Sequence, residues 1–69
     1  MESIKIREEF IKLGQAMKLA SFVSEGVEAK YAILDGKVSV NGEVCLQRGK
    51  KLYPGDVFSY EGKTVEVSK

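Results

Sequence analysis

The fold of this chain is decided by one short stretch, which reads Gly36-Lys37-Val38-Ser39-Val40-Asn41-Gly42-Glu43-Val44. On its first arm valine alternates with polar residues, which is the two-residue period of a β-strand. Asn41-Gly42 is the strongest short-range hairpin signal, because both residues tolerate the positive φ of a type I′ turn. Gly36 is well placed to cap a preceding helix, where a positive φ is also needed. The stretch therefore predicts a helix that ends at Gly36 and a β-hairpin that follows at once.

The residues after this stretch predict further short strands separated by turns. Glu43-Val44-Cys45 is expected to return as the partner strand of the hairpin, and residues 47–51 are expected to form a polar, basic loop. Tyr53-Pro54-Gly55-Asp56 has proline and glycine at the two central positions of a β-turn. We expect two more strands, at residues 57–60 and 64–67.

A strand and a helix are predicted upstream of the quoted stretch. Isoleucines at positions 4 and 6 alternate with polar neighbours, which favours a strand near residues 2–7. Apolar residues then recur at helical spacing and predict a helix over about residues 12–22. Gly14 weakens this helix, so we expect it in the first turn or in contact with another backbone. The apolar stripe consists of Phe10, Leu13, Met17 and Ala20.

A second helix is predicted over about residues 26–35, after Ser24-Glu25-Gly26 breaks the pattern. Val27, Tyr31 and Leu34 fall on one face of it, with Ala29 and Ile33 beside them. Since few residues separate the two helices, they are expected to pack as a tight pair. Segregated helices and strands indicate the α+β class, with two packed helices against a small, bent, mainly antiparallel sheet.

Length and composition limit the function classes. A chain of 69 residues is expected to form one domain over residues 1–69. Such a domain buries only about 60% of its unfolded surface, which leaves little core for a deep substrate pocket. Cys45 is the only cysteine and there is no histidine, which excludes an internal disulfide, the common zinc sites and the usual Ser-His or Cys-His catalytic pairs. We therefore expect no enzyme activity, no cofactor, no metal and no small-molecule substrate.

The sequence also predicts where the protein acts. No apolar run approaches the roughly 18 residues that a membrane-spanning helix requires. Residues 1–5 lack the apolar core of a signal peptide. We therefore expect a cytoplasmic protein without a membrane partner, and a chain with this composition is expected to be a monomer.

Charge is unevenly distributed, although the net charge is only +1. Residues 12–51 carry seven basic and four acidic side chains, an excess of three positive charges, whereas the segments before and after each carry an excess of one negative charge. Such a basic middle attracts phosphate groups if folding gathers its side chains on one face.

The order of several motifs resembles a known RNA-binding family. Glu28-Ala29-Lys30 opens a helix, the stretch from Gly36 to Val44 follows, and Leu52-Tyr53-Pro54-Gly55-Asp56-Val57 closes the pattern. Together they are similar to the RNA-binding domain named after small-subunit ribosomal protein S-four, also called the α-L motif. A further resemblance, to its stand-alone bacterial subfamily of the YaaA and YbcJ type, lies in residues 13–20, 24–30 and 48–52.

This resemblance covers about residues 3–67 and implies binding to structured ribosomal RNA, with a role in ribosome assembly or association. In the family, basic residues of the two helices and of the loop after the hairpin form the RNA face. The subfamily usually has two arginines where this chain has Gln47-Arg48, and often threonine where it has Lys12. The cations carried over are Lys18, Lys30, Arg48, Lys50 and Lys51, which we expect on one exposed face, and Lys12, Gln47 and Lys37 complete the candidate RNA-binding set.

Simpler interpretations exist for these residues. A lone surface lysine is usually only a solvated charge, and residues 47–51 could be only a soluble loop. Tyr31 and Tyr53 could stack on bases, but we interpret them as packing in the core or against the hairpin. The second functional hypothesis is a protein-interaction adaptor whose basic face meets an acidic protein. An RNA-modifying enzyme is third, because the RNA-binding domain would leave no residues for a catalytic one.

Overall fold

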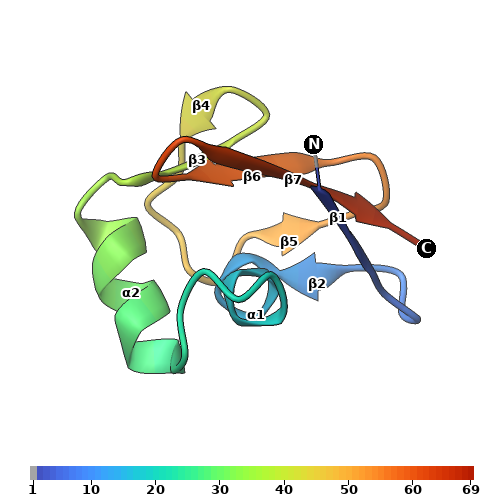
Figure 1. Cartoon of the computed structure of the whole chain (residues 1–69), viewed down its shortest axis with the longest axis horizontal. Helices are drawn as coiled ribbons and strands as arrows, with labels where there is room; N and C mark the ends of the chain where they lie inside the picture. Colours follow the sequence, from blue (N-terminus) through green and yellow to red (C-terminus); the bar gives the residue numbers. More distant parts are fainter. Residues whose placement is uncertain (1) are drawn as a thin grey trace.

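The chain folds into a five-stranded sheet with two helices below one face and a small two-stranded sheet beside them (Figure 1). The structure, a computed structural model, describes residues 2–69. The predicted α+β class is confirmed. In chain order the elements are β1 (Glu2–Lys5), β2 (Ile11–Lys12), α1 (Leu13–Leu19), α2 (Gly26–Leu34), β3 (Val38–Val40), β4 (Glu43–Val44), β5 (Lys51–Leu52), β6 (Val57–Tyr60) and β7 (Lys63–Ser68).

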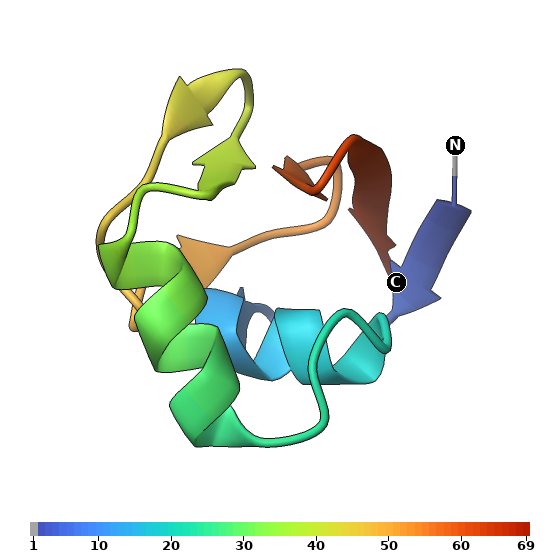
Figure 2. The ribbon, with the colours of Figure 1, turned by 60° about the vertical axis from the view of Figure 1, so that its left-hand side comes forward.

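The larger sheet has the strand order β1-β7-β6-β3-β4. Its neighbouring strands are antiparallel, except that β1 runs parallel to β7 with Ile4 beside Val67. Figure 2 shows that this sheet curves above α1, from the β3–β4 hairpin at the upper left to β1 at the right. The prediction of a bent, mainly antiparallel sheet is therefore confirmed. The first strand, β1, forms one edge of the sheet, beside the last strand, β7.

The hairpin turn forms as its sequence predicts. Asn41 and Gly42 have φ values of 51° and 87°, as a type I′ turn requires. The Asn41 side chain also ties the turn to the next strand, because its Oδ1 accepts the Val57 N–H at 3.0 Å and its Nδ2 donates to Asp56 Oδ1 at 3.2 Å. Gly36, with φ 75°, directly follows Asp35, the C-cap residue of α2, and so occupies the predicted capping position.

The core lies between the helices and the larger sheet. Leu13 and Met17, two members of the predicted apolar stripe, are fully buried, and so is Phe58 on the central strand β6. Phe22, after α1, packs edge-to-face on Phe58 with ring centroids 5.8 Å apart. Among residues 2–69 no buried position is occupied by a polar or charged side chain. The core is therefore held by apolar contact, and the charged groups remain on the surface.

The first helix is shorter than predicted. It begins at Leu13, because Ile11 and Lys12 are extended and pair with Leu52 and Lys51 in the two-stranded sheet. It ends at Leu19, shortly before a residue with positive φ. Strands of two residues are too short to show a period in the sequence, so neither β2 nor β5 was predicted, and the predicted 47–51 loop ends inside β5.

The face of the second helix that carries Val27, Tyr31 and Leu34 is not its buried face. Val27, Tyr31 and Leu34 are 56%, 61% and 56% exposed, and the buried side chains of α2 are Ala29, Ala32 and Ile33. The small alanines allow α2 to approach α1 closely, whereas a tyrosine at the contact would hold the two helices apart. The packing interpretation of Tyr31 therefore fails. That of Tyr53 holds only in part, since it lies against Phe10 but remains 48% exposed.

Candidate nucleic-acid interface

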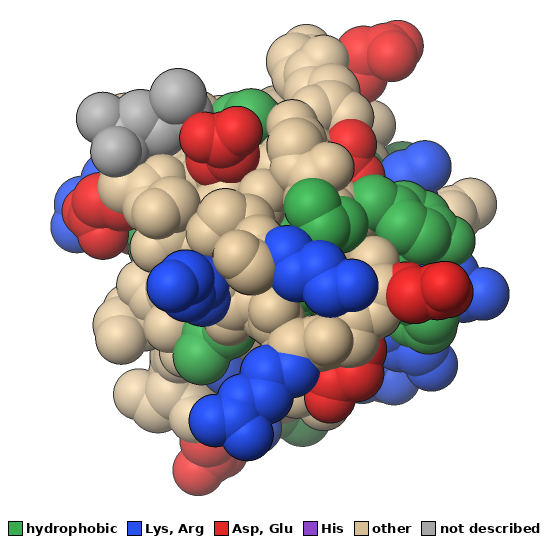
Figure 3. Space-filling model, turned by 90° about the vertical axis from the view of Figure 1, so that its right-hand side faces the viewer, with side chains coloured by type: hydrophobic (Ala, Val, Ile, Leu, Met, Phe, Trp, Pro, Cys, Tyr) green, Lys and Arg blue, Asp and Glu red, His purple; other side chains and the backbone are tan. Residues whose placement is uncertain are grey.

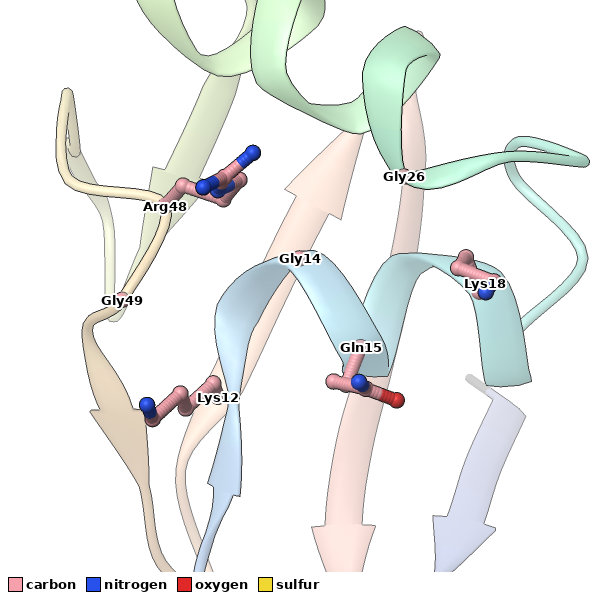
Figure 4. A pocket seen from close by; sticks show the side chains of 7 residues that line it. All are labelled: Lys12, Gly14, Gln15, Lys18, Gly26, Arg48 and Gly49. Atoms are coloured by element: carbon pink, nitrogen blue, oxygen red, sulfur yellow. The ribbon is translucent and has the colours of Figure 1, made fainter.

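Three segments distant in sequence surround one shallow hollow of about 350 Å³, shown in Figure 4. They are the β2–α1 segment, the first turn of α2 and the loop between β4 and β5. No acidic side chain is among the residues that line it. We call it the basic hollow, and its lining residues are Lys12, Gly14, Gln15, Lys18, Gly26, Arg48 and Gly49.

The polar side of α1 forms the floor of the basic hollow. Gln15 and Lys18 are three residues apart and lie along one side of α1, and Lys12, the extended residue just before the helix, lines the same hollow. Leu13 and Met17 occupy the other side and are buried. The apolar core therefore fixes the orientation of α1 and turns these two lysines outward.

The β4–β5 loop is attached to the start of α1 through its backbone. The first N–H groups of a helix have no partner within the helix, and no side chain caps α1. Instead, Leu13 N–H donates to Lys50 O at 2.8 Å and Gly14 N–H donates to Arg48 O at 3.1 Å. These two bonds hold Arg48 at the rim of the basic hollow.

Gly14 is required where α1 meets this loop. A Cβ atom at position 14 would come within 2.8 Å of Arg48 Cγ, closer than real Cβ contacts allow. The prediction that Gly14 lies in the first turn or in contact with another backbone is confirmed in both alternatives, because it is the second residue of α1 and its N–H donates to the loop. The missing side chain at position 14 therefore makes room for the stem of Arg48.

The edge of α2 next to the basic hollow carries a lysine. Gly26 lines the hollow, and Lys30 follows it by four residues, so both lie on the same edge of the helix. The acidic Glu28 lies on a different edge, where its Oε1 accepts the N–H groups of Ser24 and Glu25, each at 3.2 Å. The carboxylate in the first turn of α2 is thus used to cap the helix.

The remaining candidate residues lie outside the basic hollow. Gln47 and Lys50 border a second, more open hollow of about 470 Å³, together with the acidic Glu43. Lys51 lies on β5 directly opposite Lys12, with its Nζ 4.8 Å from the centroid of the Phe10 ring. Lys37 follows the far end of α2, roughly 13 Å along the helix from the basic hollow, and lines neither hollow.

The side of the molecule that faces away from α2 carries a different distribution of charged side chains. Figure 3 shows basic and acidic side chains interspersed on that side. Mixed signs at short spacing largely cancel the field that a polyanion would meet. The basic hollow, with two lysines, an arginine and no acid in its lining, is therefore the better candidate for an anionic partner.

All eight predicted residues are exposed, and the structure brings three of them together, namely Lys12, Lys18 and Arg48. Sequence reasoning missed Gln15, although its spacing of three residues from both lysines was a usable signal. It also placed no weight on Phe10 as a surface residue. Among residues 2–69 no group of three His, Cys, Asp or Glu side chains is arranged to hold a metal ion, and no helix is long and apolar enough to cross a membrane.

Comparisons with known proteins agree with this geometry. The S4 domain family model matches residues 4–68. The probable ribosome maturation protein RlbA of Bacillus subtilis is 46% identical over 59 residues, which are 86% of this chain and 83% of that protein. YbcJ of Escherichia coli is 33% identical over 57 residues, covering 83% of this chain and 81% of YbcJ.

A solved structure has the same fold. The solution structure of Escherichia coli YbcJ, described as containing an α-L motif involved in RNA binding, superimposes with a TM-score of 0.76. The match covers 100% of this chain and 89% of YbcJ, at 28% sequence identity. The overall α+β fold of this chain is therefore that of the YbcJ structure.

Proposed function

The chain belongs to the S4 domain family, and from this premise we propose that it binds structured ribosomal RNA through the basic hollow and acts in ribosome assembly. The observation that carries the proposal is the convergence of Lys12, Lys18 and Arg48 on one hollow whose lining includes no acid. The name of the relative RlbA supports the ribosomal part of the proposal.

The chemistry of RNA favours a site of this kind. Phosphates are the most accessible groups of a folded RNA, and lysine and arginine bind them with release of condensed counterions. A-form RNA hides its base edges in a deep, narrow groove, so a small protein recognises mainly the shape of the backbone. Cations held at fixed separations by α1 and the β4–β5 loop suit that task, and Arg48 supplies a planar fork that can bind one phosphate through two hydrogen bonds.

The proposal includes no catalytic step. The family match spans residues 4–68, and the residues of the basic hollow are cations, an amide and glycines. This set includes no hydroxyl, thiol, carboxylate or imidazole, the groups that make up the usual nucleophile and base pairs. We expect the purified protein to bind RNA without modifying a base or hydrolysing a nucleotide.

Sedimentation of a bacterial lysate on a sucrose gradient tests the ribosomal part of the proposal. The protein should travel with ribosomal subunits or their precursors at low salt and move to the top of the gradient at high salt. A variant with both Lys18 and Arg48 replaced by Ala should remain at the top at either salt concentration. If the wild-type protein stays at the top of the gradient at low salt, the ribosomal proposal fails.

A protein-interaction adaptor is the second candidate function, here through an exposed apolar surface in place of the basic face that the sequence suggested. The exposed apolar side chains Val27, Tyr31 and Leu34 on the outer side of α2 favour it, because large exposed apolar groups in a row mark many protein interfaces. The two candidates differ in the residues that they require. An adaptor would lose its partner on Tyr31→Ser, whereas RNA binding through the basic hollow would not change.

A further inference from the structure

We propose that the outer face of the β2–β5 sheet is a stacking site for one unpaired nucleotide of the bound RNA. The inference rests on the proposed function and adds one requirement for the RNA. The bound strand has an unpaired nucleotide next to the basic hollow, in a bulge, a loop or a free end. Its base would stack on Tyr53, and its phosphate would lie at Lys12 and Lys51.

The register of the small sheet places two aromatic rings and two lysines on the same face. Ile11 pairs with Leu52 and Lys12 pairs with Lys51. Leu52 points into the core and is fully buried, so the alternate residues on both strands point outward. One residue beyond the paired positions, the Phe10 and Tyr53 rings lie against each other with centroids 5.9 Å apart and an interplanar angle of 49°.

The two lysines form an unfavourable pair in the free protein. Like charges directly opposite each other on neighbouring strands repel. Both lysines are exposed, and the Lys51 ammonium lies over the Phe10 ring, 4.8 Å from its centroid. An anion bound at the two side chains would turn this repulsion into attraction. Phosphate meets that condition, and it belongs to the partner already proposed.

Tyr53 is positioned to accept a base. Its side chain is 48% exposed, while its N–H donates to Asp56 Oδ2 at 2.8 Å and so fixes the backbone below the ring. Because Lys51 covers the Phe10 ring, Tyr53 is the ring of this aromatic pair with a free surface. Stacking on an aromatic side chain is sequence-tolerant, since every base has a π-face.

The stacking site is continuous with the basic hollow through Lys12. This residue belongs to the paired face of β2 and also lines the hollow beside Gly49. A strand of RNA whose phosphates occupy the hollow therefore passes directly next to Tyr53. In the interior of a duplex every base is paired and covered by its neighbours, so the interior of a blunt duplex can fill the hollow but not the stacking site.

Binding of two short RNA duplexes tests the proposal. One is blunt, and the other is identical except for a single unpaired adenosine in the middle. Fluorescence anisotropy at low salt should show that the wild-type protein binds the bulged duplex about tenfold more tightly. Tyr53→Leu should abolish this preference and leave the affinity for the blunt duplex unchanged, whereas Tyr53→Phe should keep the preference.

Tyr31→Leu is the matched control, because Tyr31 is also exposed, at 61% against 48% for Tyr53, but lies on α2, outside the small sheet. It should bind both duplexes like the wild type. Equal binding of the two duplexes by the wild-type protein would overturn the stacking site, and this result does not depend on any variant being folded. A Tyr53→Leu protein that keeps the preference would overturn it too. Failure of the wild-type protein to bind either duplex would instead refute RNA binding itself.

Discussion

Gly14 and Arg48 form the joint between the first helix and the basic loop. The Gly14 N–H donates to the Arg48 carbonyl oxygen at 3.1 Å, and the Arg48 side chain passes through the space where a Cβ on residue 14 would stand. The backbone hydrogen bond and the side-chain contact both fix the position of Arg48 relative to α1. Position 14 therefore influences the proposed RNA contact without needing to touch RNA itself.

Gly14→Ala should weaken RNA binding through the displacement of Arg48. The new methyl group would force Arg48 Cγ away from its position, and we expect the affinity to fall about as much as it does in Arg48→Ala. The effect should vanish in the Arg48→Ala background, where no side-chain stem remains to be displaced. Anisotropy titrations of the two single variants and the double variant form the cycle that checks this, and additive losses would contradict it.

A pair of neighbouring residues on α2 tests the observed orientation of that helix. Ile33 is fully buried and Leu34 is 56% exposed. Ile33→Ala should lower the free energy of unfolding by about 2–5 kcal/mol, whereas Leu34→Ala should change it by less than about 0.5 kcal/mol. Urea denaturation followed by circular dichroism measures both values. A larger loss for Leu34→Ala than for Ile33→Ala would mean that α2 is turned the other way.

This helix also shows where prediction from the sequence reaches its limit. The hairpin, its turn and the Gly36 cap were predictable because each depends on a few adjacent residues with special backbone angles. The buried face of α2 was not predictable, because apolar residues lie on several sides of this helix. Their spacing along the sequence therefore does not identify the side that is buried. The deciding factor was the close approach of α1, which favours alanine at the contact.

The same distinction applies to the candidate site. Exposure of the eight predicted residues followed from their charge or, for Gln47, from its polar side chain. Their grouping did not, because it depends on the β2–β5 pairing and on the attachment of the loop to α1, which are contacts between residues 34 to 41 positions apart. Lys37 shows the consequence, since it belongs to the basic middle of the sequence but follows the end of α2 that lies away from the basic hollow.

Asn41 should contribute to stability in two separable ways. Asn41→Gly keeps a residue that tolerates φ 51° but loses the side-chain bonds to Val57 N–H and Asp56 Oδ1, and it should cost about 1–2 kcal/mol. Asn41→Ala loses the same bonds and, unlike glycine, keeps a Cβ in the left-handed region without the polar side chain that lets asparagine tolerate it, so it should cost about 1 kcal/mol more. Thermal and urea unfolding of both variants check the order, and equal losses would show that the backbone conformation contributes nothing.

Lys12→Gln should change stability and RNA binding in opposite directions. It removes the like charge opposite Lys51, so the midpoint of urea unfolding should rise slightly, and more at low salt than at high salt. It also removes a cation of the basic hollow, so RNA affinity should fall. Lys63→Gln, at an exposed position on β7, serves as the control and should change neither quantity. A loss of stability in Lys12→Gln would contradict the repulsion.

The salt dependence of RNA binding tests the central proposal most directly. Lys12, Lys18 and Arg48 of the basic hollow, with Lys30 on the adjacent edge of α2 and Lys51 opposite Lys12, can make about five phosphate contacts. This number predicts a slope of log K against log[salt] between about −3.5 and −4.5 on ribosomal RNA fragments. Arg48→Ala should reduce the magnitude of this slope by about one unit and weaken binding to all fragments alike, because a phosphate contact carries no sequence information. Lys69→Ala, at the exposed last residue, should leave the slope unchanged. A flat salt response of the wild-type protein, or equal effects of Arg48→Ala and Lys69→Ala, would show that the basic hollow is not the RNA-binding site.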